Sequence, residues 1–367
     1  MKIAILGTRG IPNRYGGFEA FAEQLSARLA ERGHEVSVYC RRPYTRPGDE
    51  QLVHPHVRRV ILPSIATKHL DTAINTFISA VHVAFTDAEA VLMCNVGNSA
   101  VAWIPRLFGK PVVLNVDGLD RQRRKWGWLA RTYLHFNEWL STFTPSRIVT
   151  DARAIQDYYR QRYRRESTMI GYGAAVPADS NRGDSVLQRF NLQSRRYILY
   201  VSRLEPENHP DLVIRAYHRL KIDWPLVMVG DSRYDPAYAE RLRAQSAPGV
   251  IFAGAIYGPG YWELQRHAGL FVFACEVGGI HPALIETMAA GNASLYLDTA
   301  SNRETAGDCG VVFYLDERDL AEKLDALVKD SARRAQLGAA ARLRAQQLYN
   351  WDEITRQYEA LLAEVRP

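Results

Sequence analysis

The sequence predicts an α/β protein built from two doubly wound domains in tandem. Short apolar runs alternate with segments of helical periodicity, the alternation stops once near the middle and then resumes, and 367 residues suit two ordinary domains. Such alternation is typical of parallel sheets covered by helices on both faces. We expect one domain over residues 1–173 and a second over residues 190–350. A C-terminal helix, residues 351–367, is expected to pack back on the first domain.

The first half of the chain opens with a strand and a helix. Ile3–Leu6 is an apolar run, and the segment from Phe18 to Arg32 repeats apolar side chains at helical spacing. Gly33 follows, at the position where a left-handed residue ends many helices. Four further apolar runs predict strands, and these are Val36–Cys40, Val91–Cys94, Val112–Val116 and Ile148–Thr150.

A second alternation follows a break. Residues 174–183 have the composition of a linker, with proline, glycine, aspartate, serine and asparagine close together. Beyond it, helical patterns at 211–220 and 238–245 fall between predicted strands at Ile198–Ser202, Leu226–Val229, Val250–Ala253, Leu270–Ala274, Ser294–Leu297 and Val311–Leu315. From Glu317 the pattern predicts helix, with a break near Asn350 and a last helix that reaches Val365.

Cysteine usage and the N-terminus both indicate a cytoplasmic protein. The four cysteines are far apart and none forms a C-x-x-C pair, so we expect reduced, partly buried thiols at Cys40, Cys94, Cys275 and Cys309. The opening apolar run, residues 1–6, is too short for a signal-peptide core. No stretch of the sequence approaches the ~18–20 apolar residues of a spanning helix. We therefore expect a protein that at most lies on the inner face of the cell membrane.

Positive charge is concentrated in one window of the sequence. Residues 119–166 contain eleven Lys and Arg but five Asp and Glu, an excess equal to the net charge of the whole chain, +6. Within it, residues 121–128 mix cations with tryptophan and include Arg123, Lys125 and Trp126. Cations attract anionic lipid headgroups, and tryptophan favours the membrane–water interface. We expect peripheral contact with an anionic membrane and no nucleic acid; a nucleic-acid patch and a solvated helix face are the alternatives.

A glycine-rich loop, residues 7–19, joins the first predicted strand to the first helix. It contains Gly16 and Gly17 directly before the helix, and Arg9 and Arg14 add positive charge. Glycines let the backbone approach a ligand closely, and a helix N-terminus offers free N–H groups to an anion. The dinucleotide fingerprint G-x-G-x-x-G is absent, and the second predicted strand ends in two arginines instead of an acid. An NADP-dependent oxidoreductase remains an alternative.

Two charged residues stand at predicted carboxyl strand ends, which is where doubly wound sheets bind ligands. Asp117 follows the strand at 112–116 and could orient an acceptor hydroxyl or take its proton. An Asx turn or a helix cap is the alternative for this residue. Arg203 ends the first strand of the second domain, and its charged fork suits a diphosphate. A surface salt bridge is the alternative for Arg203.

Residues 276–286 carry a second phosphate-binding pattern after another predicted strand. Gly278 and Gly279 can expose backbone N–H groups, and Pro282 suits the first turn of a helix. A phosphate could therefore bind at the N-terminus of that helix. Glu286 lies one turn further along and could accept hydrogen bonds from two ribose hydroxyls.

Several blocks of sequence, in one order along nearly the whole chain, together carry a resemblance. They are Gly7–Pro12 with Tyr15–Glu19, Asn115–Leu119 with Lys125-Trp126, Arg203 with Pro206–Asn208, Val229–Ser232, Gly254–Tyr257, Gly278–Glu286 and Ala306–Asp308. In these blocks the chain resembles retaining glycosyltransferases of family 4, which have the GT-B fold of two Rossmann-like domains facing across a cleft. More narrowly, it is similar to a bacterial rhamnosyltransferase-type branch.

The resemblance implies roles for these residues. Gly16 and Gly17 would pack against the diphosphate and sugar of a donor, and Arg203 would hold the diphosphate. Glu286 would be the second acid of the family's E-x7-E motif and bind the donor ribose, while Asp117 would lie beside the acceptor or the reacting sugar. Asp117 and Glu286 are thus the expected catalytic residues. The donor-binding set is Gly16, Gly17, Arg203, Asn208, Glu276, Gly278, Gly279, Pro282 and Glu286, and the acceptor- or membrane-side set is Arg9, Tyr15, Arg123, Lys125 and Trp126.

Two positions depart from the broader family's pattern. Asn208 stands where that family has a lysine, so one cation for the diphosphate is missing, although the narrower branch shares the change. The first acid of E-x7-E should fall at Gly278, and the nearest acid is Glu276, two residues earlier. Because the first acid usually contacts the sugar, the identity of the donor sugar is left open.

We therefore expect transfer of a hexose or deoxyhexose, such as rhamnose, from a nucleoside-diphosphate sugar with retention of configuration. The acceptor would be a saccharide or lipid-linked saccharide in cell-surface polysaccharide synthesis. Catalysis would consist of positioning and of neutralising the departing diphosphate. No D-x-D motif stands in a suitable place, so we expect no metal and no cofactor beyond the nucleotide-sugar co-substrate. A sugar-nucleotide epimerase of the same fold and a two-lobed sugar-binding protein without catalysis are the alternatives.

Overall fold

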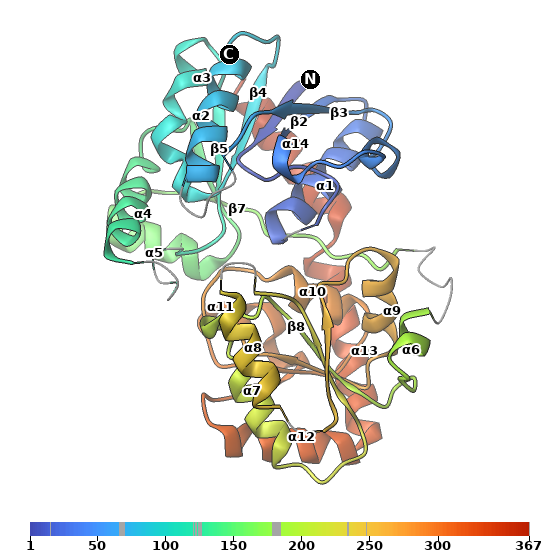
Figure 1. Ribbon diagram of the computed structural model, residues 1–367. Coiled ribbons are helices and arrows are strands. Elements are labelled where there is room, and N and C mark those ends of the chain that lie inside the picture. Colours follow the sequence, from blue (N-terminus) through green and yellow to red (C-terminus); the bar gives the residue numbers. More distant parts are fainter. Residues whose placement is uncertain are drawn as a thin grey trace. The chain divides into compact units, whose positions relative to one another are not determined.

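The computed structural model divides the chain into two compact units (Figure 1). It describes residues 1–14, 16–65, 70–119, 121, 123, 127–177, 185–232, 235–246 and 248–366. Unit 1 comprises Met1–Gly173 and Trp351–Pro367, and unit 2 comprises Ala174–Asn350. Each unit is built around its own parallel sheet.

Unit 1 contains a seven-stranded sheet in the order β3-β2-β1-β4-β5-β6-β7, and every neighbouring pair is parallel. The strands are β1 Lys2–Leu6, β2 Glu35–Arg41, β3 Val57–Leu62, β4 Ala90–Cys94, β5 Val112–Val116, β6 Arg147–Thr150 and β7 Thr168–Met169. The strand order reverses between β1 and β4, and the carboxyl ends beside such a reversal are where doubly wound sheets bind ligands.

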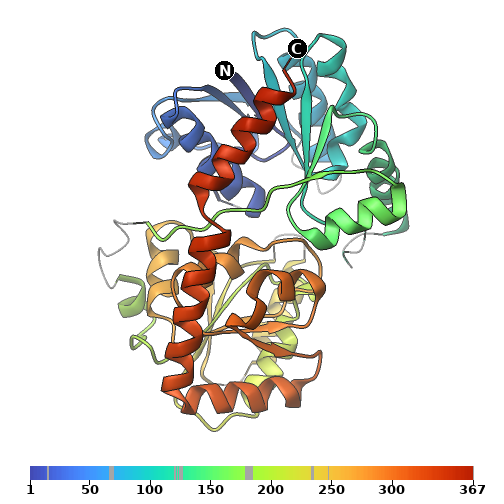
Figure 2. The same ribbon diagram turned by 180° about the vertical axis from the view of Figure 1, so that it is seen from behind.

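Helices surround this sheet, and the last one comes from the far end of the sequence. They are α1 Gly17–Glu31, α2 Leu70–Ala84, α3 Trp103–Leu107, α4 Trp128–Leu140, α5 Arg153–Tyr163 and α14 Trp351–Glu364, with short 3-10 turns η1 Arg42–Tyr44, η2 Asp49–Leu52 and η3 Val96–Val101. The red segment in Figure 2 shows α14 lying on unit 1.

Aromatic packing attaches α14 to α1. The ring of Phe21 lies 6.4 Å from that of Trp351 and 5.2 Å from that of Tyr358, measured between centroids. Asn115 Nδ2 in β5 donates a hydrogen bond of 2.7 Å to the Tyr358 hydroxyl. A side chain on Gly173 would overlap the Trp351 ring. The packing of α14 therefore also requires a glycine at residue 173, where the N-terminal part of unit 1 ends.

Unit 2 contains a six-stranded parallel sheet in the order β10-β9-β8-β11-β12-β13. The strands are β8 Ile198–Val201, β9 Leu226–Val229, β10 Val250–Gly254, β11 Leu270–Phe273, β12 Ser294–Leu297 and β13 Val311–Phe313. The helices are α6 Ser185–Arg189, α7 Pro210–His218, α8 Pro236–Ala244, α9 Pro259–His267, α10 Pro282–Ala289, α11 Ala300–Ala306, α12 Glu317–Lys329 and α13 Ser331–Leu348, with turns η6 Pro206–Asn208 and η7 Gly307–Cys309. Helices α7 and α8 lie on one side of the sheet and α9 and α13 on the other (Figure 1).

The predicted α/β class with two doubly wound sheets is confirmed. Three features were missed, and one of them is the two-residue strand β7. Strand β3 was not predicted because Arg58 and Arg59 interrupt its apolar run. The helix predicted from Glu317 is two helices, because the Asp330 side chain accepts a hydrogen bond from the Arg333 backbone and starts α13 there. In the described residues, no helix is both long and apolar enough to cross a membrane.

We predict that Gly338→Ala destabilises the protein. A Cβ at this position of α13 would overlap the Gly291 carbonyl oxygen, which follows α10. Helix propensity alone favours alanine by about 1 kcal/mol, whereas overpacking costs about 1–3 kcal/mol, so the net change should lower the melting temperature. Exposed Ala339→Gly on the same helix is the matched control for propensity. A Gly338→Ala protein that melts at a higher temperature would contradict this packing.

Candidate functional site

Arg203 stands just beyond the carboxyl end of β8. Its side chain is 32% exposed, and Nη1 lies 3.6 Å from Glu205 Oε1. Gly230, directly after the neighbouring strand β9, has φ +144°, and a Cβ there would overlap the Ser202 carbonyl oxygen. The ends of β8 and β9 therefore approach each other closely, which fixes the backbone from which the Arg203 side chain starts.

Asn208 lies inside the loop that follows Arg203. The residue is 3% exposed, and its Nδ2 donates a hydrogen bond of 2.8 Å to the Arg203 carbonyl oxygen. The Asn208 carbonyl oxygen accepts a bond of 2.8 Å from the Tyr200 hydroxyl. The Asn208 side chain, which stands where the broader family has a lysine, thus bonds to the start of the loop. It would affect donor binding indirectly, by positioning Arg203.

The N-terminus of α10 follows the loop after β11. Pro282 is its first residue, and the side chain of the N-cap residue His281 makes no capping hydrogen bond in the described part of the chain. The backbone N–H groups of a first helical turn have no partner within the helix, and they carry the positive end of the helix dipole. Such an end suits an anion, and proline at the first position sacrifices no helical hydrogen bond. Because β8 and β11 are neighbours in the sheet, this helix start and Arg203 belong to adjacent carboxyl strand ends.

Gly278 gives a physical reason for the displaced acid of the E-x7-E pattern. Its φ is +153°, and a Cβ would overlap the His281 ring. The Ser301 hydroxyl donates a hydrogen bond of 3.0 Å to the Gly278 carbonyl oxygen and holds this backbone in place. A glutamate at position 278 would therefore require the loop to rearrange. The next residue, Gly279, is buried within the same loop.

Glu276, the nearest acid, contacts the loop after β8. Its Oε2 lies 3.1 Å from His209 Nε2, and its backbone N–H donates a bond of 3.0 Å to the Glu207 carbonyl oxygen. His209 is 8% exposed and adopts φ +48° directly before α7. The loops after β8 and β11 are therefore bonded to each other by a side-chain contact and a backbone contact.

Glu286 lies in the second turn of α10 and is oriented by α9. The Tyr261 hydroxyl donates a hydrogen bond to Glu286 Oε2, and Gln265 Nε2 donates a bond of 2.9 Å to the same hydroxyl. Burial raises the pKa of the Glu286 carboxyl, and the bond from Tyr261 partly opposes this. Burial, followed by the charge of Glu286, raises the pKa of the Tyr261 phenol well above its usual value.

Sequence reasoning missed two features of this half of the site. Tyr261 carries no local signal, because its importance arises only from the packing of α9 on α10. Glu207 lies in a noted block but received no role. It is fully buried, and among the described residues its two carboxylate oxygens accept no hydrogen bond.

In unit 1, two of the predicted loop's glycines are required by packing. Gly7 has φ +91°, and a side chain there would overlap the Cys94 carbonyl oxygen at the end of β4. Gly10 has φ +111°, and its Cβ would lie 2.6 Å from Cys40 Sγ in β2. These two glycines therefore let the loop cross the ends of the neighbouring strands.

The other two glycines begin α1. Gly16 is its N-cap residue and Gly17 its first residue, and the N-cap supplies no side-chain hydrogen bond among the residues that the structure describes. Glu19 Oε1 accepts a bond of 2.9 Å from the Arg9 backbone N–H and lies 4.0 Å from Arg9 Nη1. The Arg9 guanidinium stacks over the Tyr44 ring at 5.3 Å and its side chain is 15% exposed. Arg9 thus packs largely against its own unit.

Arg41, one of the two arginines on which an NADP-binding interpretation depended, is buried. It forms a 2.7 Å ion pair with Asp71. Its Nε donates a bond of 3.1 Å to the Thr8 carbonyl oxygen. These contacts join β2 to the glycine-rich loop and to α2, so this guanidinium has a structural role.

Asp117 follows β5 directly and is half-buried. Burial, with the Asp117 carboxylate as the next cause, raises the pKa of the Cys94 thiol well above its usual value. The same two causes raise the pKa of the buried Tyr172 hydroxyl. Asp117 therefore lies at the carboxyl ends of β4 and β5, beside the reversal of strand order in this sheet.

The predicted basic patch is only partly described. Arg121 Nε donates a bond of 3.0 Å to Glu138 Oε2, and Nη2 donates one of 2.9 Å to the Tyr158 hydroxyl. Arg123 is half-buried. Tyr15, Lys125 and Trp126, which were assigned to the acceptor or membrane side, lie outside the described residues.

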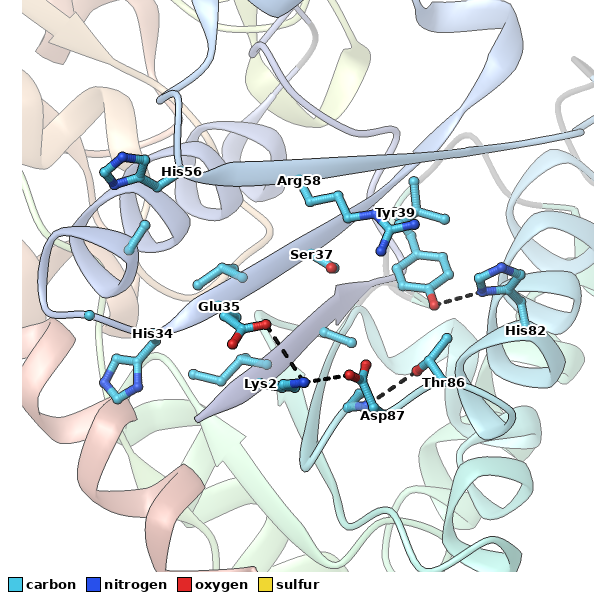
Figure 3. Close-up of a pocket in the computed structure, with 17 residues that line it drawn as sticks. Lys2, His34, Glu35, Ser37, Tyr39, His56, Arg58, His82, Thr86 and Asp87 are labelled. Atoms are coloured by element: carbon cyan, nitrogen blue, oxygen red, sulfur yellow. Dashed lines mark hydrogen bonds and ion pairs between the residues drawn. The ribbon is translucent and has the colours of Figure 1, made fainter.

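A hollow of about 500 Å³ lies elsewhere on unit 1, over β1, β2 and β3 (Figure 3). Its ionisable groups largely pair with one another. Lys2 contacts Asp87 and Glu35, and the Tyr39 hydroxyl lies 2.9 Å from His82 Nδ1. None of the predicted site residues lines it. In the described residues, no group of three or more His, Cys, Asp or Glu side chains is arranged to hold a metal ion.

Two family models match this chain. Residues 187–344 match the family described as "Glycosyl transferases group 1", and residues 1–175 match a "Domain of unknown function (DUF1972)". The first match contains Arg203, the start of α10 and Glu286. The second contains the glycine-rich loop and Asp117.

One curated relative is an N-acetylgalactosamine-N,N'-diacetylbacillosaminyl-diphospho-undecaprenol 4-alpha-N-acetylgalactosaminyltransferase from Campylobacter jejuni, 29% identical over 45% of this chain and 46% of the relative. The chain spans about half the length of the curated relatives it matches.

Solved structures share the fold over nearly the whole chain. Sucrose-phosphate synthase from Thermosynechococcus elongatus superposes with a TM-score of 0.84 at 20% identity, covering 99% of this chain and 98% of that one. HepE from Anabaena in complex with UDP-glucose superposes with a TM-score of 0.81 at 17% identity, covering 99% and 100%. The two sheets therefore have the GT-B fold, and together with the family matches these likenesses support a glycosyltransferase.

We predict that Tyr261→Phe raises the pKa of Glu286 further. The ionised carboxylate loses its hydrogen-bond donor, while burial continues to favour the neutral form. A carboxyl whose pKa is raised by folding destabilises the folded state once the pH exceeds the unfolded-state value, and the loss is complete above the folded-state pKa. Tyr261→Phe should extend this pH-dependent loss of stability to higher pH.

The titration can be measured by carboxyl NMR on protein with isotope-labelled glutamate, with Glu286→Gln used to assign the resonance. Tyr314→Phe, at an exposed tyrosine of unit 2, is the matched control. An unchanged or lowered Glu286 pKa in Tyr261→Phe would show that the phenol does not stabilise the carboxylate.

Proposed function

We propose that the chain is a retaining glycosyltransferase of the family 4 type that transfers a hexose or deoxyhexose, such as rhamnose, from a nucleoside-diphosphate sugar. The observation that carries the proposal lies in unit 2. Arg203 and the uncapped start of α10 occupy the carboxyl ends of the adjacent strands β8 and β11. These groups fall within the region matched to the group 1 family, and the structural likeness to a protein solved with UDP-glucose supports a nucleotide sugar as donor.

Each group in unit 2 suits one part of such a donor. The Arg203 fork can bind two phosphate oxygens, and the N–H groups before and within the first turn of α10 can bind others. Glu286, oriented by Tyr261, suits the ribose hydroxyls. Because sugar transfer leaves negative charge on the diphosphate, a fixed cation and a helix dipole at that point lower the barrier. These groups supply the positive field without a metal ion in this proposal.

The acceptor side of the proposal rests on unit 1. Asp117 stands at a carboxyl strand end, half-buried and beside the reversal of strand order. A carboxylate there can orient an acceptor hydroxyl or take its proton. Gly16 and Gly17, at the uncapped start of α1, offer backbone N–H groups and leave room for a ligand.

A lipid-linked saccharide is the acceptor that we propose. The Campylobacter jejuni relative is named for a diphospho-undecaprenol acceptor, which supports this class of substrate. The rhamnosyltransferase-type pattern of the sequence favours a role in cell-surface polysaccharide synthesis. The enzyme would then be cytoplasmic and peripheral at the inner face of the cell membrane.

We predict that Arg203→Ala and Glu286→Ala each weaken nucleotide binding by roughly ten- to a hundredfold. A hydrogen bond to a charged group contributes about 1.5–3 kcal/mol, and each variant removes one such partner. Calorimetric titration with UDP, GDP and dTDP measures the effect, and thermal melting confirms that the variants are folded.

Arg215→Ala is the matched control for the arginine. Arg215 is exposed and pairs with Asp211 and Glu317 on the surface of α7 and α12. Its nucleotide affinity should equal that of the unsubstituted chain. Unchanged affinity in both Arg203→Ala and Glu286→Ala would mean that the donor binds elsewhere.

We predict that Asp117→Asn keeps nucleotide affinity but lowers turnover by roughly a hundredfold or more, the usual contribution of a positioned acid–base group. The amide preserves size and removes the charge. Release of nucleoside diphosphate in the presence of acceptor measures turnover, and Asp87→Asn, at an exposed carboxylate paired with Lys2, is the control. Normal turnover in Asp117→Asn would show that Asp117 has only a structural role in the turn after β5.

A further inference from the structure

Large apolar side chains are exposed on three helices of unit 1. The residues are Phe77, Val81 and Phe85 on or just after α2, Trp103, Leu107 and Phe108 on or just after α3, and Trp128, Leu129, Phe136, Trp139 and Phe143 on or just after α4. Leu107 is 72% exposed and Trp128 is 74% exposed. Single exposed apolar residues are common, whereas a cluster of this size indicates a surface that binds something.

Helical spacing places these side chains on the outer side of each helix. Phe77 and Val81 are four residues apart in α2, as are Trp103 and Leu107 in α3. In α4 the exposed Phe136 and Trp139 are three residues apart. Residues three or four apart share one face of a helix, so each helix carries an outward apolar stripe.

Direct contacts join the three stripes into one surface. The rings of Phe85 and Phe108 lie 4.9 Å apart, which connects the ends of α2 and α3. Arg106 Nη1 donates a bond of 3.2 Å to the Phe143 carbonyl oxygen, which connects α3 to the end of α4. The rings of Trp139 and Phe143 lie 4.7 Å apart. Figures 1 and 2 both show the three helices along one flank of unit 1, and we call this surface the aromatic face.

The exposed charged side chains on the three helices of the aromatic face are positive. Asp87, an exposed carboxylate two residues after Phe85, pairs with Lys2. The acidic residues of the three helices are Asp71 in α2 and Glu138 in α4, and both are buried. Asp71 pairs with Arg41 and Glu138 with Arg121, so neither presents a negative charge at the surface. By contrast, Arg106 is exposed at the end of α3, and Arg131 is exposed one turn from Trp128.

We propose that the aromatic face docks on the surface of an anionic lipid bilayer. Tryptophan and phenylalanine side chains would enter the headgroup region, and Arg106 and Arg131 would meet lipid phosphates. The exposed apolar side chains match the apolar interior of a bilayer. The flanking cations match its anionic headgroups, and the acidic side chains of these helices are buried. Docking does not require that the chain transfers a sugar, because it involves neither donor nor acceptor.

Co-sedimentation of the full chain with phosphatidylcholine vesicles, with and without phosphatidylglycerol, tests the proposal. We expect binding that is stronger to the anionic vesicles and weakens as salt rises. Leu107→Ser and Trp139→Ser should each reduce partitioning by about tenfold, the effect of no longer burying one large apolar side chain. Leu343→Ser, at a 56% exposed leucine on α13 of unit 2, is the matched control and should bind like the unsubstituted chain.

Arg131→Glu provides a second variant that leaves the apolar stripes intact. It should weaken binding to anionic vesicles while leaving binding to neutral ones unchanged. The proposal fails if the unsubstituted chain does not bind anionic vesicles, or if Leu343→Ser loses as much binding as Leu107→Ser. It also fails if sedimentation velocity shows a dimer that Leu107→Ser and Trp139→Ser convert to a monomer without vesicle binding, because a second copy then covers the face.

Discussion

The proposed donor site depends on the pairing of β8 with β11 and on the contact between the loops that follow them. Glu276 joins those loops through its backbone bond to Glu207 and its side-chain contact with His209. This arrangement brings the Arg203 loop and the start of α10 to neighbouring strand ends. The same packing explains why position 278 is a glycine. The left-handed turn and the His281 ring leave no room for the acid that the broader family carries there.

Several residues of unit 1 that the sequence analysis singled out have structural roles. Gly7 and Gly10 let the loop cross β4 and β2, and Arg41 is buried against Asp71. At the carboxyl strand ends of this unit, Asp117 and the start of α1 have a proposed ligand-binding role. The unit also carries the aromatic face, so its two proposed contacts, with an acceptor and with a membrane, use different elements of one sheet-and-helix framework.

Much of the fold and part of the site could be predicted from sequence, because the signals are local. Apolar runs gave most strands, and Pro282 after a glycine pair gave the start of α10. Tyr261 could not be found this way, since its bond to Glu286 depends on the packing of two helices. The burial of Asn208 was likewise invisible, because only the folded loop shows its amide turned to the Arg203 carbonyl. The aromatic face emerged only when exposure revealed that apolar residues of helical spacing point outward.

The most direct test of the central claim is a crystal structure of the chain with a bound nucleoside diphosphate. We expect a diphosphate within hydrogen-bonding distance of the Arg203 guanidinium and of the backbone N–H groups at the start of α10. We also expect ribose hydroxyls at the Glu286 carboxylate. A nucleotide bound away from these groups, for example in the hollow over β1, β2 and β3, would contradict it.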